Sequence, residues 1–198
     1  MACETVAHTR ALASGGMRLE INRTLDRFLS GVERRALRMA SISTGNQDEA
    51  LDIVQDAMMR FASRYSARAE TDWGPLFHRI LQNAVTDWHR RSRVRRRWHQ
   101  FIGVGETVVE QSDPLSGIAD PLAREPDAQL QDGEAMRRLE RAIGELPLRQ
   151  QQAFMLRLWE GLNVEQTAAA MGCSQGSVKT HYSRAVHCLR EKLEGYWP

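Results

Sequence analysis

Residues 163–193 read NVEQTAAAMGCSQGSVKTHYSRAVHCLREKL, and this stretch predicts two short helices joined by a tight turn. Asn163 is a good N-cap residue, and Gln166, three positions later, completes the reciprocal pattern of a capping box. Gly172 can adopt the left-handed conformation in which many helices end, and Ser174 can cap the next helix. This pattern is typical of a helix-turn-helix, although an ordinary helical hairpin shares it.

The second of these helices has one apolar side and one polar side. Its apolar residues recur at spacings of three and four and are Val178, Tyr182, Ala185, Leu189 and Leu193. Short polar side chains opposite them would let the helix enter a DNA major groove, where its first residues meet base edges and its basic residues meet phosphates. The residues expected to contact DNA are Ser174, Gln175, Ser177, Lys179, Thr180, Ser183 and Arg184.

Charge is segregated along the chain. The formal net charge is +2, from 27 Lys and Arg against 25 Asp and Glu, yet residues 89–98 (HRRSRVRRRW) are almost wholly cationic. Residues 106–134 instead carry eight acids and a single arginine. The acidic stretch has no helical periodicity and contains three prolines, which is typical of a linker.

Helical patterns on both sides of this linker, without an alternating strand pattern, predict an all-α fold of two small domains. We expect a disordered N-terminus at residues 1–17, a helical domain at 18–102, a flexible acidic linker at 103–133 and a helix-turn-helix domain at 134–198. Either Met1 or Met17 fits the start of translation.

Several classes of protein are disfavoured by the composition. The three cysteines have no paired spacing, so they indicate neither a disulfide framework nor a zinc site. No apolar run approaches transmembrane length, and the first residues lack the apolar core of a signal peptide. The six histidines show no metal-ligand spacing, and the sequence has no Gly-rich phosphate loop or nucleophile elbow. We therefore expect a cytoplasmic protein that is not an enzyme, holds no cofactor or metal and does not insert into membranes.

The helical pattern from Asp48 to Tyr65 has two distinct sides. The stripe predicted to be buried contains Leu51, Val54, Met58, Phe61 and Tyr65. Another side carries Asp52, Gln55, Asp56 and Met59, with Ile53 further round. Because acids, an amide and a thioether share it, this side favours a protein-binding face. A solvated surface with scattered apolar residues is the alternative.

The next predicted helix starts near Pro75 and continues into the arginine cluster. Its buried side contains Phe77, Ile80, Leu81, Ala84 and Trp88. Its polar side carries Arg79, Asn83, Thr86 and Arg90. Guanidinium groups neutralise phosphates, and aromatic and amide side chains hold unstacked bases. We therefore expect nucleic acid to bind along this helix.

These motifs occur in a recognisable order. Asp52-Ile53-Val54-Gln55-Asp56 is followed by Arg60, then by Leu76-Phe77-His78-Arg79-Ile80 with Asn83 and Asp87, and finally by Glu160-Gly161-Leu162 and Gly176-Ser177-Val178-Lys179-Thr180. Together they resemble bacterial RNA polymerase sigma factors of the extracytoplasmic-function (ECF) group of the sigma-70 family. The resemblance covers nearly all of the chain except the first two dozen residues. It identifies residues 18–102 with sigma region 2 and residues 134–198 with sigma region 4.

The resemblance implies that the chain binds core RNA polymerase and directs promoter recognition, DNA melting and transcription initiation. The residues it assigns to the largest polymerase subunits are Asp52, Ile53, Gln55, Asp56, Met59 and Arg60. Those it assigns to the minus-ten promoter element are Arg79, Asn83, Asp87, Trp88, Arg90 and Arg91. The helix-turn-helix would read the minus-thirty-five element, and an anti-sigma factor would be a further partner.

Two other functions stay open. A stand-alone helix-turn-helix regulator explains the C-terminal domain but leaves the Asp52–Arg60 signature without a purpose. A sigma-like mimic that sequesters an anti-sigma factor would keep the fold but lose DNA-reading residues, whereas Asn83 and Arg184 are present. Thr167 and Cys173 stand where the family places larger aliphatic residues, which predicts looser packing in the helix-turn-helix.

Overall fold

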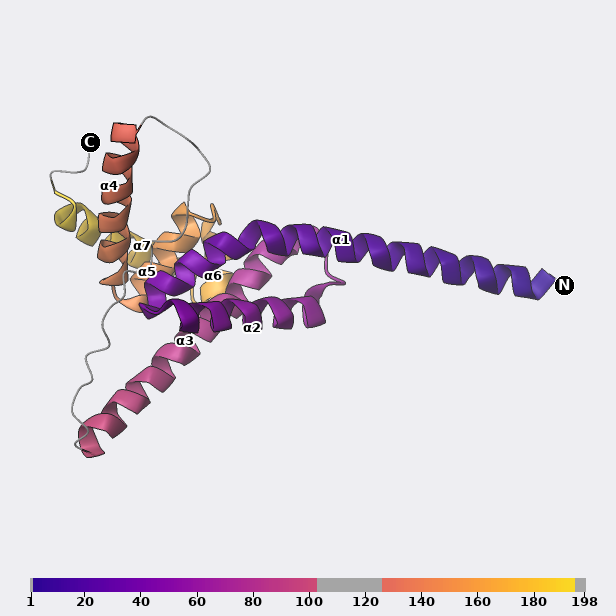
Figure 1. Ribbon diagram of the computed structural model, residues 1–198, viewed down its shortest axis with the longest axis horizontal. Coiled ribbons are helices and arrows are strands. Elements are labelled where there is room, and N and C mark those ends of the chain that lie inside the picture. The colour runs from indigo at the N-terminus through magenta and orange to yellow at the C-terminus, as the bar shows by residue number, and fades with distance from the viewer. Residues whose placement is uncertain (1, 103–125, 195–198) are drawn as a thin grey trace.

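A computed structural model describes the backbone of residues 2–102 and 126–194, and side chains of residues 22–95, Trp98 and 134–194. Over the described backbone the chain forms α-helices and no strand, which confirms the predicted all-α class (Figure 1). The helices are α1 (Ala2–Thr44), α2 (Gln47–Tyr65), α3 (Glu70–Ile102), α4 (Pro126–Gly144), α5 (Leu148–Leu158), α6 (Val164–Met171) and α7 (Gln175–Lys192). Most of the predicted acidic linker, residues 103–125, lies outside this description.

The first helix begins earlier than the sequence analysis predicted. We expected residues 1–17 to be disordered, but α1 starts at Ala2. No proline interrupts the helix up to Thr44, and alanine, leucine, arginine and methionine, which favour helix, recur along it. The two adjacent glycines at positions 15 and 16 do not end it.

Two more helices begin before their predicted starts. The start of α3 is Glu70 rather than Pro75, and the acids Glu70 and Asp72 in its first turn interact favourably with the helix dipole. The start of α4 is Pro126, inside the segment that we assigned to the linker. Proline fits the first helical position because the amide hydrogen that it lacks has no partner within the helix there.

An aromatic cluster joins the three N-terminal helices. The Phe28 ring of α1 lies 5.4 Å from the rings of both Phe61 and Trp73, measured between centroids. Phe77 of α3 packs edge-to-face on Phe61 at 5.9 Å. Each such ring buries a large apolar area, so this cluster fixes how α1, α2 and α3 lie against one another.

The C-terminal helices pack against the N-terminal ones and extend the same core. The buried residues that form it include Met39, Phe61 and Leu81 from the N-terminal half and Ile143 and Leu189 from the C-terminal half. Helices α4 and α5 contact α1, and α6 contacts α3. The two predicted domains therefore share one hydrophobic core in this arrangement, and the division of the chain at residues 103–133 stays a prediction. No helix within the described ranges is long and apolar enough to cross a bilayer.

Candidate nucleic-acid and protein interfaces

One side of α2 presents the polar residues that the sequence analysis grouped there. Asp52 and Gln55 are exposed, and Met59 keeps 67% of its surface accessible. Asp56 is half-buried and forms an ion pair with Arg60 one turn later, with a separation of 2.8 Å between Oδ2 and Nη2. The structure thus brings two acids, an amide, a thioether and an arginine together on one open face of α2.

The structure confirms the buried stripe of α2 at Val54 and Phe61 and corrects it at two other positions. Ile53 was assigned to the exposed face, but it is only 6% exposed and belongs to the core. Leu51 was assigned to the buried stripe, but it is 42% exposed. Ala50 and Ala57 are fully buried, so the buried sector is turned toward these small residues and toward Ile53.

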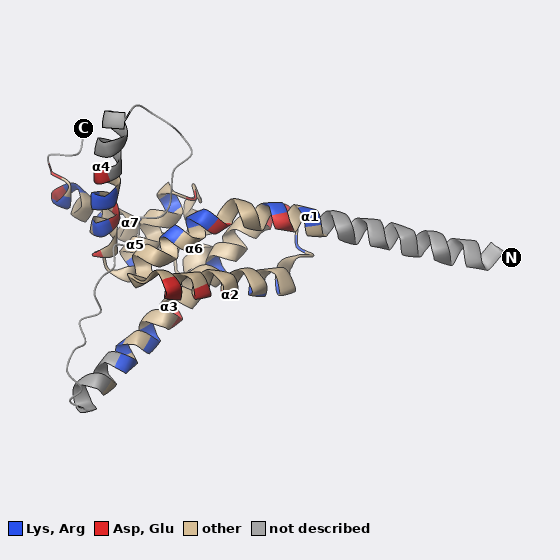
Figure 2. Cartoon of the chain, viewed as in Figure 1, with Lys and Arg blue, Asp and Glu red and all other residues tan. Residues whose placement is uncertain are grey.

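The second candidate surface lies on α3, whose distal half carries a row of basic residues (Figure 2). Arg79, Asn83, Arg90 and Arg91 are exposed, as predicted. Asp87 is exposed too, and its Oδ1 lies 3.7 Å from Arg90 Nη1. This part of α3 therefore offers both cationic and hydrogen-bonding groups to a nucleic acid.

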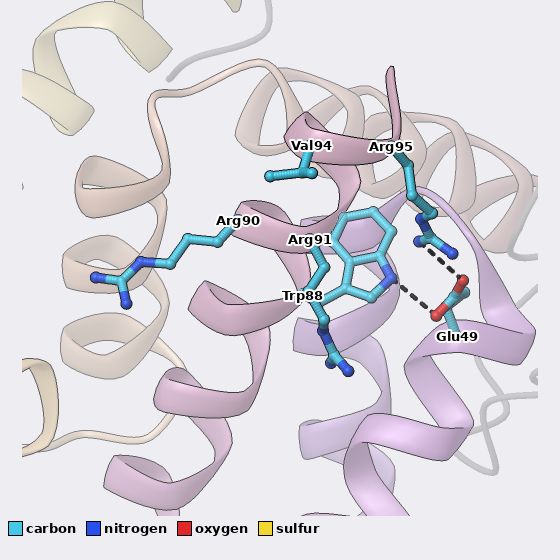
Figure 3. Close-up of a pocket in the computed structure, with 6 residues that line it drawn as sticks. All are labelled: Glu49, Trp88, Arg90, Arg91, Val94 and Arg95. Carbon is cyan, nitrogen blue, oxygen red and sulfur yellow. Dashed lines mark hydrogen bonds and ion pairs between the residues drawn. The ribbon is translucent and has the colours of Figure 1, made fainter. Parts of the chain in front are cut away.

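An open pocket of about 500 Å³ lies where α3 passes the first turn of α2. Its lining residues are Glu49, Trp88, Arg90, Arg91, Val94 and Arg95 (Figure 3). Trp88 is half-buried, and its indole Nε1 donates a hydrogen bond of 2.8 Å to Glu49 Oε2. Arg95 Nη2 lies 3.5 Å from the other Glu49 oxygen. Sequence reasoning singled out Trp88 but missed Glu49.

The third candidate surface is the helix-turn-helix formed by α6 and α7. The predicted capping box is present: Gln166 N–H donates to Asn163 Oδ1 at 2.8 Å, and Asn163 N–H donates to Gln166 Oε1 at 2.9 Å. Gly172 ends α6 with φ at +62°, and the Ser174 hydroxyl caps α7 by accepting from Ser177 N–H at 3.1 Å. The local signals in the sequence therefore predicted this motif correctly.

Replacing Asn163 with alanine is expected to lower the free energy of unfolding by about 1 kcal/mol, because the amide hydrogen of Gln166 loses its acceptor. Urea denaturation followed by circular dichroism measures this change. An Asn163→Asp variant keeps an acceptor at the cap and should lose little stability. Equal losses in the two variants would contradict the capping role.

One side of α7 packs inward and the other is open. Val178, Ala185 and Leu189 are buried. The residues predicted to contact DNA that are exposed on the open side are Gln175, Lys179, Thr180, Ser183 and Arg184. Ser177 is half-buried, and its hydroxyl lies 2.9 Å from that of Ser174. The hydroxyls of these two serines are therefore already engaged with each other at the start of α7.

The predicted looseness between α6 and α7 is not observed at Thr167. Its side chain is fully buried, and its hydroxyl donates to the Asn163 carbonyl at 2.7 Å, so the polar group is satisfied. Arg149, which sequence reasoning missed, donates from Nη1 to the Met171 carbonyl at 2.7 Å and satisfies the C-terminal end of α6.

Comparison with known proteins shows which proteins the chain resembles. Residues 136–189, which span most of α4 through α7, match the family described as Sigma-70, region 4. The RNA polymerase sigma-E factor of Streptomyces avermitilis is 28% identical over 159 residues, which are 80% of this chain and 78% of that protein. The ECF RNA polymerase sigma factor SigM of Mycobacterium tuberculosis is 28% identical over 176 residues, which are 86% of this chain and 77% of SigM. The chain is thus similar to ECF sigma factors of the sigma-70 family, and its residues 136–189 match region 4 of that family.

A solved structure shows the same fold. In the co-crystal structure of the sigma factor RpoE with the anti-sigma factor NepR from Bartonella quintana, the RpoE chain superposes with a TM-score of 0.56. The alignment covers 92% of this chain and 99% of the other chain, at 23% sequence identity. The helical arrangement is thus shared although most side chains differ.

A buried ionic contact joins the two halves of the chain. The side chain of Glu160, just after α5, is 5% exposed, and its Oε2 lies 3.0 Å from Nε2 of the buried His78 on α3. The Nε of Arg35 on α1 donates to Glu160 Oε1 at 3.0 Å. Burial by itself would raise the pKa of Glu160. The hydrogen bond from His78, its charge, and the charge and hydrogen bond of Arg35 outweigh burial, so the pKa lies below its ordinary value.

Further polar contacts join α5 to α1 and α3. Ser43 Oγ donates to Gln151 Oε1 at 2.6 Å, and Gln152 Nε2 donates to Thr86 Oγ1 at 3.3 Å. Thr86, which we expected on the open polar side of α3, is therefore half-covered by α5. Buried polar groups need specific partners, so these bonds favour one placement of α5 against α1 and α3.

Proposed function

We propose that this chain is a sigma factor that binds core RNA polymerase through α2, opens the minus-ten promoter element with α3, and reads the minus-thirty-five element with α7. The observation that carries the proposal is the presence of two separate DNA-suited helices in one chain, the basic α3 beside its indole-lined pocket and the open side of α7. A stand-alone regulator needs only the second. RNA synthesis is left to the polymerase, and the sigma factor supplies binding and positioning groups.

The polymerase contact is proposed for the exposed face of α2. Asp52 and Gln55 form no hydrogen bond to another side chain among the described contacts, so their polar groups are open to a partner. The adjacent Met59 adds an apolar, adaptable side chain to the same face. Acids around an exposed apolar residue suit a basic groove on the largest polymerase subunits.

The minus-ten contact is proposed for α3 and the pocket beside it. Arg90 and Arg91 would neutralise phosphates, while the half-buried Trp88 ring offers a stacking surface for a base at the edge of opened DNA. Exposed Asn83, on the same helix, carries the donor and acceptor pair that suits a base edge.

The two groups of α7 side chains are expected to respond differently to mutation. Lys179→Ala should weaken binding to all minus-thirty-five sequences about equally and lower the salt slope by about one, because it removes a phosphate contact. Changes at Gln175 or Thr180 should instead shift the preference between bases. Binding of the holoenzyme to a set of single-base promoter variants at several salt concentrations measures both effects. Identical behaviour of the two sets would contradict these roles.

The partners and location follow from the same proposal. Core RNA polymerase and promoter DNA are the expected partners, and both place this sigma factor in the cytoplasm. The structural relative RpoE forms a complex with the anti-sigma factor NepR. We propose that an anti-sigma factor also binds the present chain. This partner would hold the chain inactive until a signal releases it.

Selection of promoters tests the proposal. Core polymerase with this chain would be incubated with a genomic DNA library, and the retained fragments would be sequenced and probed for unpaired thymines. Two conserved blocks at a fixed spacing, with DNA opened at the downstream block, are expected. A single block without opening would instead indicate a stand-alone regulator, and no DNA retention would favour a mimic that only sequesters an anti-sigma factor.

A further inference from the structure

Glu49 occupies the third position of α2, where a glutamate commonly turns back to the N-cap residue. Here Asn46 caps the helix by accepting from the Glu49 N–H at 3.0 Å. The amide hydrogen of Asn46, the usual partner of such a glutamate, is bonded to Thr44 Oγ1 at 3.2 Å. The Glu49 carboxylate is therefore not needed at the start of its own helix.

The carboxylate of Glu49 instead reaches across to α3. One oxygen accepts the indole hydrogen of Trp88 at 2.8 Å, and the other lies 3.5 Å from Arg95 (Figure 3). Trp88 and Glu49 are 39 residues apart in the sequence, so this bond links the first turn of α2 to the middle of α3. The ring of Trp88 also meets the His89 ring edge-to-face, with centroids 5.0 Å apart.

An acid in this position has an electrostatic cost for DNA binding. The other charged residues that line the pocket are Arg90, Arg91 and Arg95, and each attracts phosphate. A carboxylate among them repels phosphate and weakens the attraction. If Glu49 favours DNA binding or opening, it must do so through the side chain that it holds in place rather than through its charge.

We infer that Glu49 is a positioning residue for promoter opening, because its hydrogen bond fixes the Trp88 indole in the orientation that stacks on a base at the edge of the opened DNA. This inference rests on the proposed role of Trp88 at the minus-ten element. An aromatic ring gains most from stacking when it is held in place beforehand. Without Glu49 the indole loses the hydrogen bond that fixes its orientation, and base-pair opening slows while initial DNA binding is kept.

The test has two parts. The first measures the rate at which a duplex promoter opens, and the second measures transcription from a promoter that already carries an unpaired minus-ten stretch. The full chain is combined with core polymerase, and opening is followed by 2-aminopurine fluorescence. Glu49→Ala should open the duplex about tenfold more slowly, since a hydrogen bond to a charged acceptor is lost. On the pre-opened promoter its transcription should match the native chain. Glu49→Gln retains an acceptor for the indole and should restore opening to within about twofold.

Two controls separate positioning from charge and from failure of the proposed function. Asp48→Ala removes an exposed acid from the same helical turn, and it should open the duplex at the native rate. Trp88→Ala tests the role of Trp88 itself. Normal opening by Trp88→Ala would overturn that role and this inference together. Slow opening by Trp88→Ala with normal opening by Glu49→Ala would overturn only the inference.

A double-mutant cycle remains informative where Glu49→Ala alone lowers stability. Trp88→Phe keeps an aromatic ring but lacks the indole hydrogen. Glu49→Ala should therefore slow opening in the native background but add less than about twofold in the Trp88→Phe background, because the bond it removes is already absent. Fully additive effects would overturn the inference.

Discussion

Replacing Asp52, Gln55 and Asp56 together with alanine is expected to lower the affinity of the chain for core RNA polymerase by at least about 100-fold. The variant removes two charges and an amide from one face of α2, so the proposed contact with complementary groups of the polymerase is lost. The fold should persist because only Asp56 has an internal ionic partner, the surface residue Arg60. Fluorescence anisotropy of the labelled chain, titrated with core polymerase, measures the affinity.

A matched triple variant controls for charge and composition. Glu33→Ala, Gln47→Ala and Glu70→Ala also remove two exposed acids and an exposed amide, but they lie off the proposed polymerase face. This control should bind core polymerase with nearly native affinity. Similar affinities for the two triple variants would show that the face of α2 is not the polymerase contact.

Replacing Glu160 with alanine is expected to lower the free energy of unfolding by about 3 kcal/mol at neutral pH. The change leaves the buried His78 without its partner and removes the acceptor for Arg35 at the junction of α1, α3 and α5. Urea denaturation measures the loss. Glu33→Ala, which removes an exposed glutamate from α1, should change stability by less than about 0.5 kcal/mol. Equal stability of the two variants would contradict the structural role of Glu160.

The same contact predicts a pH dependence. The pKa of Glu160 lies below its model-compound value of 4.5, so its ionised form is favoured by folding. Its contribution is therefore present above pH 4.5 and lost as the pH falls through the lower pKa of the folded state. The stability difference between the native chain and Glu160→Gln should be largest near neutral pH and should shrink below about pH 4.5. A difference that grows on acidification would contradict this assignment.

Local sequence signals were sufficient for the helix-turn-helix. The capping box of Asn163 and Gln166, the left-handed Gly172 and the cap at Ser174 depend on residues three or four positions apart, so the sequence displays them directly. The predicted buried stripe of α2 was right at Val54 and Phe61 but wrong at Leu51, because periodicity counts large apolar side chains. The buried sector includes Ala50 and Ala57, whose small size gave no such signal.

Contacts between residues far apart in the sequence could not be predicted from its local periodicity. His78 and Glu160 are 82 residues apart, and nothing in the local periodicity of either segment indicates that α6 and the end of α5 lie on α3. Glu49 illustrates a different difficulty. A glutamate three residues after Asn46 is typical of a capping box, in which its carboxylate accepts from the Asn46 N–H. Only the structure shows that Thr44 Oγ1 accepts from this N–H instead. The Glu49 carboxylate is therefore free to form its tertiary contact with Trp88.

Run-off transcription tests the central claim most directly. Purified bacterial core polymerase would be supplied with a promoter selected as described above and with either the native chain or the Asp52→Ala, Gln55→Ala, Asp56→Ala variant. A discrete transcript from the native chain that is lost with the variant is the predicted result. DNA binding by the native chain without any core-dependent transcript would contradict its assignment as an initiating sigma factor.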